Sequence, residues 1–213
     1  TDGKITIDDN IMKWVDDSKE LVDAGETSTA ELWSDDWKKG FYPDGKVFCY
    51  FGPAWLVNFS MAAEDEGSIA NLGGWGATQG PQGFFWGGTW ICAAAGTDNA
   101  NLVKDVMKTL CCDKATMKKI TEDTQDYTNT TSGMNEIASS NFKSDFLGGQ
   151  NHIKLFAKSA PKISMKNISS YDQGLNEEFQ KAMKDYFEGN CDKDTAIETF
   201  KKAVIEKYPD LAE

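Results

Sequence analysis

Residues able to carry covalent or metal chemistry are few in this sequence and poorly arranged for it. His152 is the only histidine, so any serine or cysteine nucleophile activated by histidine would depend on it. It follows Gly-Gly-Gln-Asn, which is no recognisable nucleophile turn, and we expect a surface or helix-capping histidine. The cysteines show no C-x-x-C spacing, and we expect small buried core residues at Cys49, Cys92, Cys111, Cys112 and Cys191. The sequence therefore predicts no catalytic residue, no metal site and no cofactor.

Acidic residues come in pairs, which raises the possibility of glycoside chemistry. A glycosidase needs two carboxyl groups that face each other across a cleft. The pairs found here are typical of helix caps and solvated helix faces instead. They are Asp8-Asp9, Asp16-Asp17, Asp35-Asp36 and the run Glu64-Asp65-Glu66.

Composition excludes several classes of protein. The 213 residues include 34 Asp and Glu, 22 Lys and no Arg, for a formal net charge of -12. A field of that sign does not attract nucleic acid. With 40% hydrophobic residues the chain is not intrinsically disordered, and no apolar run approaches the roughly 20 residues of a membrane-spanning helix.

Tryptophans are the most promising residues for binding. Trp55 follows Gly-Pro-Ala at the end of a predicted strand, and Trp86 and Trp90 flank Gly87-Gly88-Thr89. An indole beside small residues at a chain turn is readily exposed, and a flat apolar ring with polar neighbours suits the C–H face of a sugar. The tryptophans at helical spacing, which are Trp14, Trp33 and Trp37, are expected in the core.

The elements that would position these residues are many helices and few strands. Helices are predicted after the caps Asp8 or Asp9, Ser28 (with Glu31), Thr97-Asp98, Asp113 and Asp192, and over residues 175–187. Residues 122–145 are expected to form short helices and loops. Strands are predicted at 3–7, 46–51 and 84–94. The fold class expected is therefore α/β, with its sheet completed by strands not recognised here or by a part of the protein absent from this sequence.

Residues 41–55 (FYPDGKVFCYFGPAW) resemble a segment of the solute-binding proteins of bacterial sugar ABC importers, the maltose-binding-protein type. In that family the segment reads F-x-x-G-K-x-A-M-x-x-x-G-P-W. The glycine-rich stretch 75–81, the run Gly87-Gly88-Thr89-Trp90 and the later Tyr171-Asp172-Gln173 follow in the family's order. The resemblance extends over nearly the whole chain.

The resemblance implies a two-lobe fold of the periplasmic-binding-protein type II class, with a sugar held between the lobes. This chain would supply mainly the C-terminal lobe and part of the N-terminal lobe. Residues 1–82 would begin the second lobe, 83–145 would enter the first lobe, and 146–213 would return with the C-terminal helices.

The resemblance also implies ligand-binding residues. Trp55 corresponds to the family's stacking tryptophan, and Gly87 and Gly88 correspond to a glycine pair whose backbone approaches the ligand. Trp86 and Trp90 adjoin that pair. Tyr171 and Asp172 lie where the family places an aromatic and a polar contact, although a maltose-type tryptophan is missing there. Gln150 and Asn151 lie near a lobe crossing, with a hinge favoured over ligand contact.

The implied function is to bind a mono- or oligosaccharide and deliver it to an ABC importer permease, without catalysis. The implied location is extracellular, at the cell envelope, with membrane attachment only through a lipid anchor outside this sequence. Three alternatives stay open. One is a glycoside-active enzyme or carbohydrate module, and another is a solute-binding protein for a non-sugar polar ligand. The third is a folded fragment that binds no ligand because its other lobe is missing.

Overall fold

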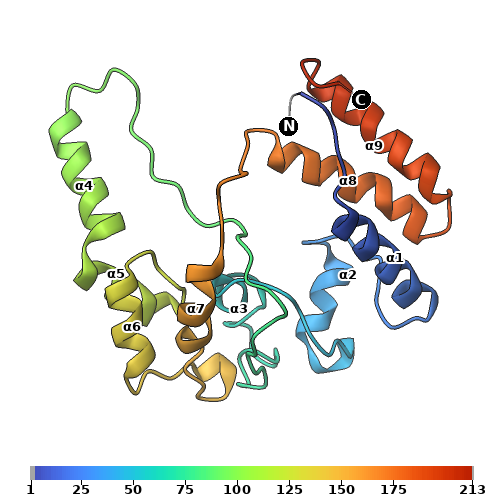
Figure 1. Cartoon of the computed structure of the whole chain (residues 1–213). Coiled ribbons are helices and arrows are strands. Elements are labelled where there is room, and N and C mark those ends of the chain that lie inside the picture. Colours follow the sequence, from blue (N-terminus) through green and yellow to red (C-terminus); the bar gives the residue numbers. More distant parts are fainter. Residues whose placement is uncertain (1–2, 213) are drawn as a thin grey trace. The chain divides into compact units, whose positions relative to one another are not determined.

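The computed structural model describes residues 3–212, and this part of the chain is helical (Figure 1). Its α-helices are α1 (Asp9–Asp23), α2 (Asp35–Lys38), α3 (Trp55–Ser60), α4 (Ala100–Cys112), α5 (Lys114–Thr124), α6 (Thr131–Ser139), α7 (Ile153–Ser159), α8 (Asp172–Phe187) and α9 (Lys193–Lys207). Short 3-10 helices are η1 (Lys39–Phe41), η2 (Pro43–Gly45), η3 (Asp145–Leu147) and η4 (Ala160–Lys162). None of the helices in the described part is long and apolar enough to cross a bilayer.

The expected α/β two-lobe fold of the periplasmic-binding-protein type is wrong, because residues 3–212 form no sheet. Extended pairing is limited to isolated bridges between Lys4 and Ala212 and between Ser144 and Gln150. The predicted strands 46–51 and 84–94 are irregular, and residues 46–51 and 84–93 make no backbone–backbone hydrogen bond. An apolar run rich in β-forming residues becomes a strand only beside a partner strand, and the described chain places none there.

The chain divides into two compact units. Unit 1 contains Thr1–Leu32 and Lys166–Glu213, and unit 2 contains Trp33–Met165. The three-segment organisation with boundaries after 82 and 145 stays a prediction.

Unit 1 is built from α1, α8 and α9, with α8 packed against both of the others (Figure 1). Its helices begin where the sequence predicts: Asp8 accepts a hydrogen bond from the Asn10 N–H, and Asp192 accepts one from the Thr195 N–H. The apolar faces meet in a core that includes Val15, Met183 and Val204, all fully buried. Burial of each such side chain contributes about 1.5–3 kcal/mol.

Unit 2 holds two separate clusters of buried side chains. One is formed by Phe41, Leu56 and Met61 around α3, and the other by residues of α6 and α7. Helices α5 and α6 are joined by Glu136, whose carboxylate accepts hydrogen bonds from Lys114 and Lys118. These two ammonium groups lower the pKa of Glu136 to about 2. As expected, residues 122–145 form short helices and loops.

Two predicted helix starts are wrong. Ser28 and Glu31 start no helix, and α2 begins instead at Asp35 with Ser34 accepting a hydrogen bond from the Trp37 N–H. The N-cap of α4 is Asn99, and neither Thr97 nor Asp98 occupies that position. By contrast, Asp113 caps α5 as predicted, because its carboxylate accepts a hydrogen bond from the Thr116 N–H.

Candidate functional site

Trp55 is positioned by α3, of which it is the first residue. The next residue, Leu56, is buried against Phe41 and Met61 and so anchors the short helix. Gly52 makes this possible, since a Cβ at that position would lie 2.2 Å from Leu56 Cδ2. With Leu56 turned into the core, Trp55 is left half-buried at the edge of the cluster.

Three indoles gather in unit 2, and we call Trp33, Trp55 and Trp86 the tryptophan trio. The rings of Trp33 and Trp55 are stacked, with centroids 6.2 Å apart and planes 25° apart. Trp86 completes the group, 5.3 Å from Trp55 and 6.0 Å from Trp33. Trp55 Nε1–H donates to the carbonyl oxygen of Trp86 at 3.3 Å, which fixes the orientation of the Trp55 ring. The trio is not sealed in the interior, because Trp33 is 44% exposed and Trp55 and Trp86 are only partly buried.

Of the glycine pair Gly87-Gly88, only one residue lies against the trio. Gly87 lies against Trp55, since a Cβ there would be 3.4 Å from Trp55 Cζ2, and its φ of +69° favours glycine. Gly88 also has a positive φ, but no atom lies within 4 Å of where its Cβ would be. The structure therefore brings together three of the candidate residues, Trp55, Trp86 and Gly87, while Gly88 stands in open space.

Two further aromatic residues differ in their relation to the trio. Phe59, one helical turn after Trp55 on α3, packs edge-on against the Trp55 ring at 6.2 Å and is otherwise exposed. Trp90 is 75% exposed, and none of the aromatic ring pairs found among the described residues includes it. The trio thus gains Phe59 as a neighbour, which the sequence reasoning missed, whereas Trp90 stands apart.

Tyr171 and Asp172 belong to unit 1, where local contacts occupy both side chains. The Tyr171 hydroxyl donates to the Asp210 carboxylate, which raises the pKa of that tyrosine. The Asp172 carboxylate accepts hydrogen bonds from the N–H and the hydroxyl of Ser169 at 3.0 and 2.7 Å. These contacts give both residues a structural role at the start of α8.

Gln150 and Asn151 also make local contacts, in unit 2. The Gln150 side chain pairs with both backbone groups of Ala77, accepting from its N–H at 2.7 Å and donating to its carbonyl at 2.6 Å. Asn151 donates to the carbonyl of Ile137 at 2.9 Å. Both side chains therefore hold loops of one unit together, and their proposed hinge role stays a prediction.

His152 is buried rather than on the surface, and it occupies the N-cap position of α7. Its Nε2–H donates to the carbonyl of Gln125 at 2.7 Å, and burial lowers its pKa. The imidazole is therefore neutral near pH 7 and ties the end of α5 to the start of α7.

The acidic pairs behave as expected: Asp8 caps a helix, and Asp16, Asp17 and Asp36 form exposed ion pairs.

The expected burial of cysteines and helical tryptophans is mostly wrong. All five cysteines are free, Cys49, Cys92 and Cys112 are exposed, and the remaining two are only partly buried. Within the described residues no three His, Cys, Asp or Glu side chains gather in a way that could hold a metal ion.

Trp37 packs on the core beside Phe41, as expected, but Trp14 is 52% exposed and Trp33 joins the trio.

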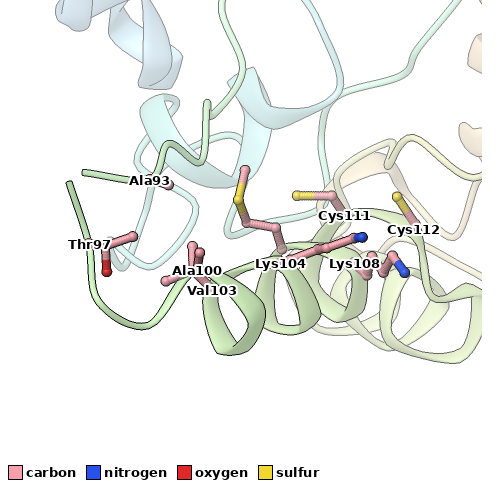
Figure 2. Close-up of a pocket in the computed structure, with 9 residues that line it drawn as sticks. Ala93, Thr97, Ala100, Val103, Lys104, Lys108, Cys111 and Cys112 are labelled. Atoms are coloured by element: carbon pink, nitrogen blue, oxygen red, sulfur yellow. The ribbon is translucent and has the colours of Figure 1, made fainter. Parts of the chain in front are cut away.

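A concave feature lies along α4 and differs in chemical character from the trio. A hollow of about 450 Å³ is lined by residues 93 and 97 and by one face of the helix. Figure 2 shows the residues that line it. Its lining is Ala93, Thr97, Ala100, Val103, Lys104, Met107, Lys108, Cys111 and Cys112. No carboxylate or amide side chain lines it, so it offers sugar hydroxyls few of the partners that orient them.

Comparison with known proteins adds no relative: no family model, no curated protein and no solved structure matches this chain.

Proposed function

We propose that this chain binds a carbohydrate without altering it, and that the tryptophan trio is the surface on which the sugar stacks. The observation that carries the proposal is the fixed, half-buried Trp55 ring, held by its Nε1–H bond to Trp86 and adjoined by the exposed ring of Trp33. A sugar ring presents C–H groups on its face and hydroxyls on its edge, so it needs a flat apolar surface beside polar groups.

Polar side chains follow Trp33 closely in the sequence. Asp35 follows Trp33 by two residues, and its side chain is fully exposed, with Lys38 at 4.0 Å as its ion-pair partner. Asp36 is already paired closely with Lys39. Asp35 is therefore the carboxylate freer to accept hydrogen bonds from sugar hydroxyls.

We further propose that the chain delivers its sugar to the permease of an ABC importer at the extracellular face of a cell envelope. This part of the proposal is supported by the sequence resemblance of residues 41–55 and of the segments that follow them. It concerns the ligand and its delivery, and not the two-lobe fold, which the structure contradicts.

Titration calorimetry of the chain with mono-, di- and trisaccharides tests the binding. We expect micromolar dissociation constants for the preferred sugar, equivalent to about -8 kcal/mol. Trp55→Ala should weaken binding about tenfold or more, because one stacked ring is lost.

Trp14→Ala is the control, since Trp14 is an indole of unit 1 that is 52% exposed and contacts one aromatic ring, Phe187. Unchanged affinity in Trp55→Ala, or equal losses in both variants, would remove the trio from the site. Hydrolysis of chromogenic glycosides by the wild-type chain would favour the glycoside-active alternative instead.

A further inference from the structure

The hollow along α4 is lined mainly by apolar groups that stay in contact with solvent. Ala93 belongs to the extended segment before the helix, whereas Ala100, Val103 and Met107 belong to α4 itself. No residue of α4 is buried, so no other part of the described chain covers this lining. Apolar surface that is both concave and uncovered is typical of a site for an apolar ligand.

Two lysines give the hollow a positive charge. Lys104 and Lys108 lie four residues apart on one face of α4, and both line the hollow. The lysines of the neighbouring helix α5 are paired, since Lys114, Lys118 and Lys119 each bond to a carboxylate. None of the ion pairs found in residues 3–212 includes Lys104 or Lys108. In a chain with a net charge of -12, these two ammonium groups are thus available to an anion from outside.

The charge is gathered toward one end of the hollow. Figure 2 shows Lys104 and Lys108 with their nitrogen atoms directed toward the end of α4 that carries Cys111 and Cys112. Asp105, the one acidic residue of α4, is not among the lining residues and so places no competing carboxylate there. The first turn of α4 forms the uncharged end.

The dimensions of the hollow suit a slender ligand. Its volume of about 450 Å³ lies within the roughly 300–1,000 Å³ of small-molecule sites. Ala100 and Cys111 both line it, so it follows the helix axis for about 16 Å. Lysine stems lie along apolar surface while their ammonium groups stay in water. A ligand that fits is therefore elongated and apolar, with an anionic group at one end.

We propose that this hollow binds a fatty acid. The alkyl chain lies over Val103 and Met107 toward the first turn of α4, and the carboxylate pairs with Lys104 and Lys108. A fatty acid combines the two properties that the lining selects, because its chain removes apolar surface from water and its head is the counter-ion of lysine. None of these residues belongs to the tryptophan trio, so the proposal does not rest on carbohydrate binding.

Titration calorimetry of the full chain with dodecanoate, kept below the concentration at which it forms micelles, tests the proposal. Dodecanoate should bind severalfold more tightly than dodecanol, which has the same chain without the charge. No binding of dodecanoate, or equal affinity for dodecanol, would overturn the proposal.

A carboxylate placed at the uncharged end tests where the alkyl chain lies. Ala100→Asp should lower the affinity for dodecanoate about tenfold or more, because it puts a charge against the chain. The variant should fold, since Ala100 is the first residue of α4 and an acidic side chain stabilises that position. Asn101→Asp is the matched control, because Asn101 is the next residue, is exposed and does not line the hollow. Equal losses in the two variants would contradict the assignment.

Replacing both lysines tests the carboxylate end. Lys104→Gln combined with Lys108→Gln should weaken dodecanoate binding roughly three- to tenfold and leave dodecanol binding unchanged. Lys154→Gln combined with Lys158→Gln is the control, since these exposed lysines have the same spacing on α7 and lie outside the hollow. The proposal fails if the two double variants bind dodecanoate equally.

Thiol alkylation locates the ligand without any substitution. Cys112 lines the hollow, Cys49 does not, and both are exposed. Saturating dodecanoate should slow the alkylation of Cys112 by iodoacetamide severalfold and leave Cys49 unaffected, as measured by mass spectrometry of the peptides. Equal protection of the two thiols would show detergent-like coating of the chain and would rule out this site.

Discussion

Trp55 is oriented before any ligand arrives, because its one polar atom already donates to the carbonyl of Trp86. The ring also packs against Gly87 on one side and Phe59 on another. A side chain held in this way loses little rotamer freedom on binding, and an ordering cost of about 0.5–1.5 kcal/mol per side chain is correspondingly reduced. If sugars stack on Trp55 as proposed, contacts internal to unit 2 therefore contribute to their affinity.

His152 makes the stability of unit 2 depend on pH. Burial lowers its pKa in the folded chain, so the unfolded chain takes up a proton at higher pH than the folded chain does. The contribution of neutral His152 to the free energy of unfolding is therefore complete above about pH 6.5. It is lost as the pH falls through the pKa that His152 has in the folded chain. The Gln125 carbonyl accepts from Nε2–H in the neutral form.

His152→Gln should remove this dependence, because the amide keeps a donor for the Gln125 carbonyl and does not titrate. Between about pH 7.5 and about pH 5, we expect the wild type to lose about 2–4 °C more in Tm than the variant. Circular dichroism melts at the two pH values measure the difference. Parallel losses in the two proteins would show that His152 is not the titrating group.

Among single residues, the sequence selected Trp55, Trp86 and Gly87 as ligand-binding candidates, which the structure places next to one another, but it assigned Trp33 to the core. Trp33 and Trp37 are four residues apart, which favours one helix face directed into a core. Ser34 and the following Asp35 start the helix one residue after Trp33 and leave it outside. The signal that could have found this is the Ser-Asp-Asp sequence, a better helix start than Ser28 with Glu31.

At the scale of elements, the helix caps show which sequence signals are enough to predict where a helix starts. Asp113→Ala should lower Tm by about 2–4 °C, because the Thr116 N–H loses its acceptor at the start of α5. Asp98→Ala is the matched control: Asp98 precedes α4 in a similar sequence context, but the N-cap there is Asn99. Thermal melts that fall equally for both variants would show that the cap bond at Asp113 does not stabilise the chain.

Helices could be predicted from sequence because their stabilising contacts are local. Asp8, Asp113 and Asp192 each bond to an N–H two or three residues ahead, so the sequence around each cap already contains both partners. The predicted strands at 46–51 and 84–94 could not be tested in this way, since the hydrogen bonds of a strand are made with a partner that is distant in the sequence. Their residue types were read correctly as apolar and β-forming, and the structure leaves them unpaired.

Charge is unevenly distributed over the whole molecule. The chain carries a net charge of -12, yet residues 67–97 contain no charged side chain at all. This stretch and residues 47–51 carry several of the exposed large hydrophobic side chains, including Phe48 at 95% exposure. Extended, uncharged, apolar segments with unpaired backbone groups are sites of self-association.

Phe48→Lys should therefore reduce self-association without lowering stability, because Phe48 is almost fully solvated and a surface change of this kind costs within about 0.5 kcal/mol. Light scattering as a function of chain concentration provides the measurement. Leu102→Lys is the control, since Leu102 is an exposed apolar residue on the helix α4 and its backbone is paired. An equal reduction by both substitutions would point to general surface hydrophobicity rather than to the extended segment.

The stacked rings of Trp33 and Trp55 have an optical consequence. Indole transitions 6.2 Å apart couple to one another, so the pair forms an exciton whose chiroptical bands depend on the angle between the rings. A solute that settles on these rings perturbs that angle and the surrounding polarity together. The chain thus contains an intrinsic chromophore that reports on its own aromatic surface, with no dye or label attached.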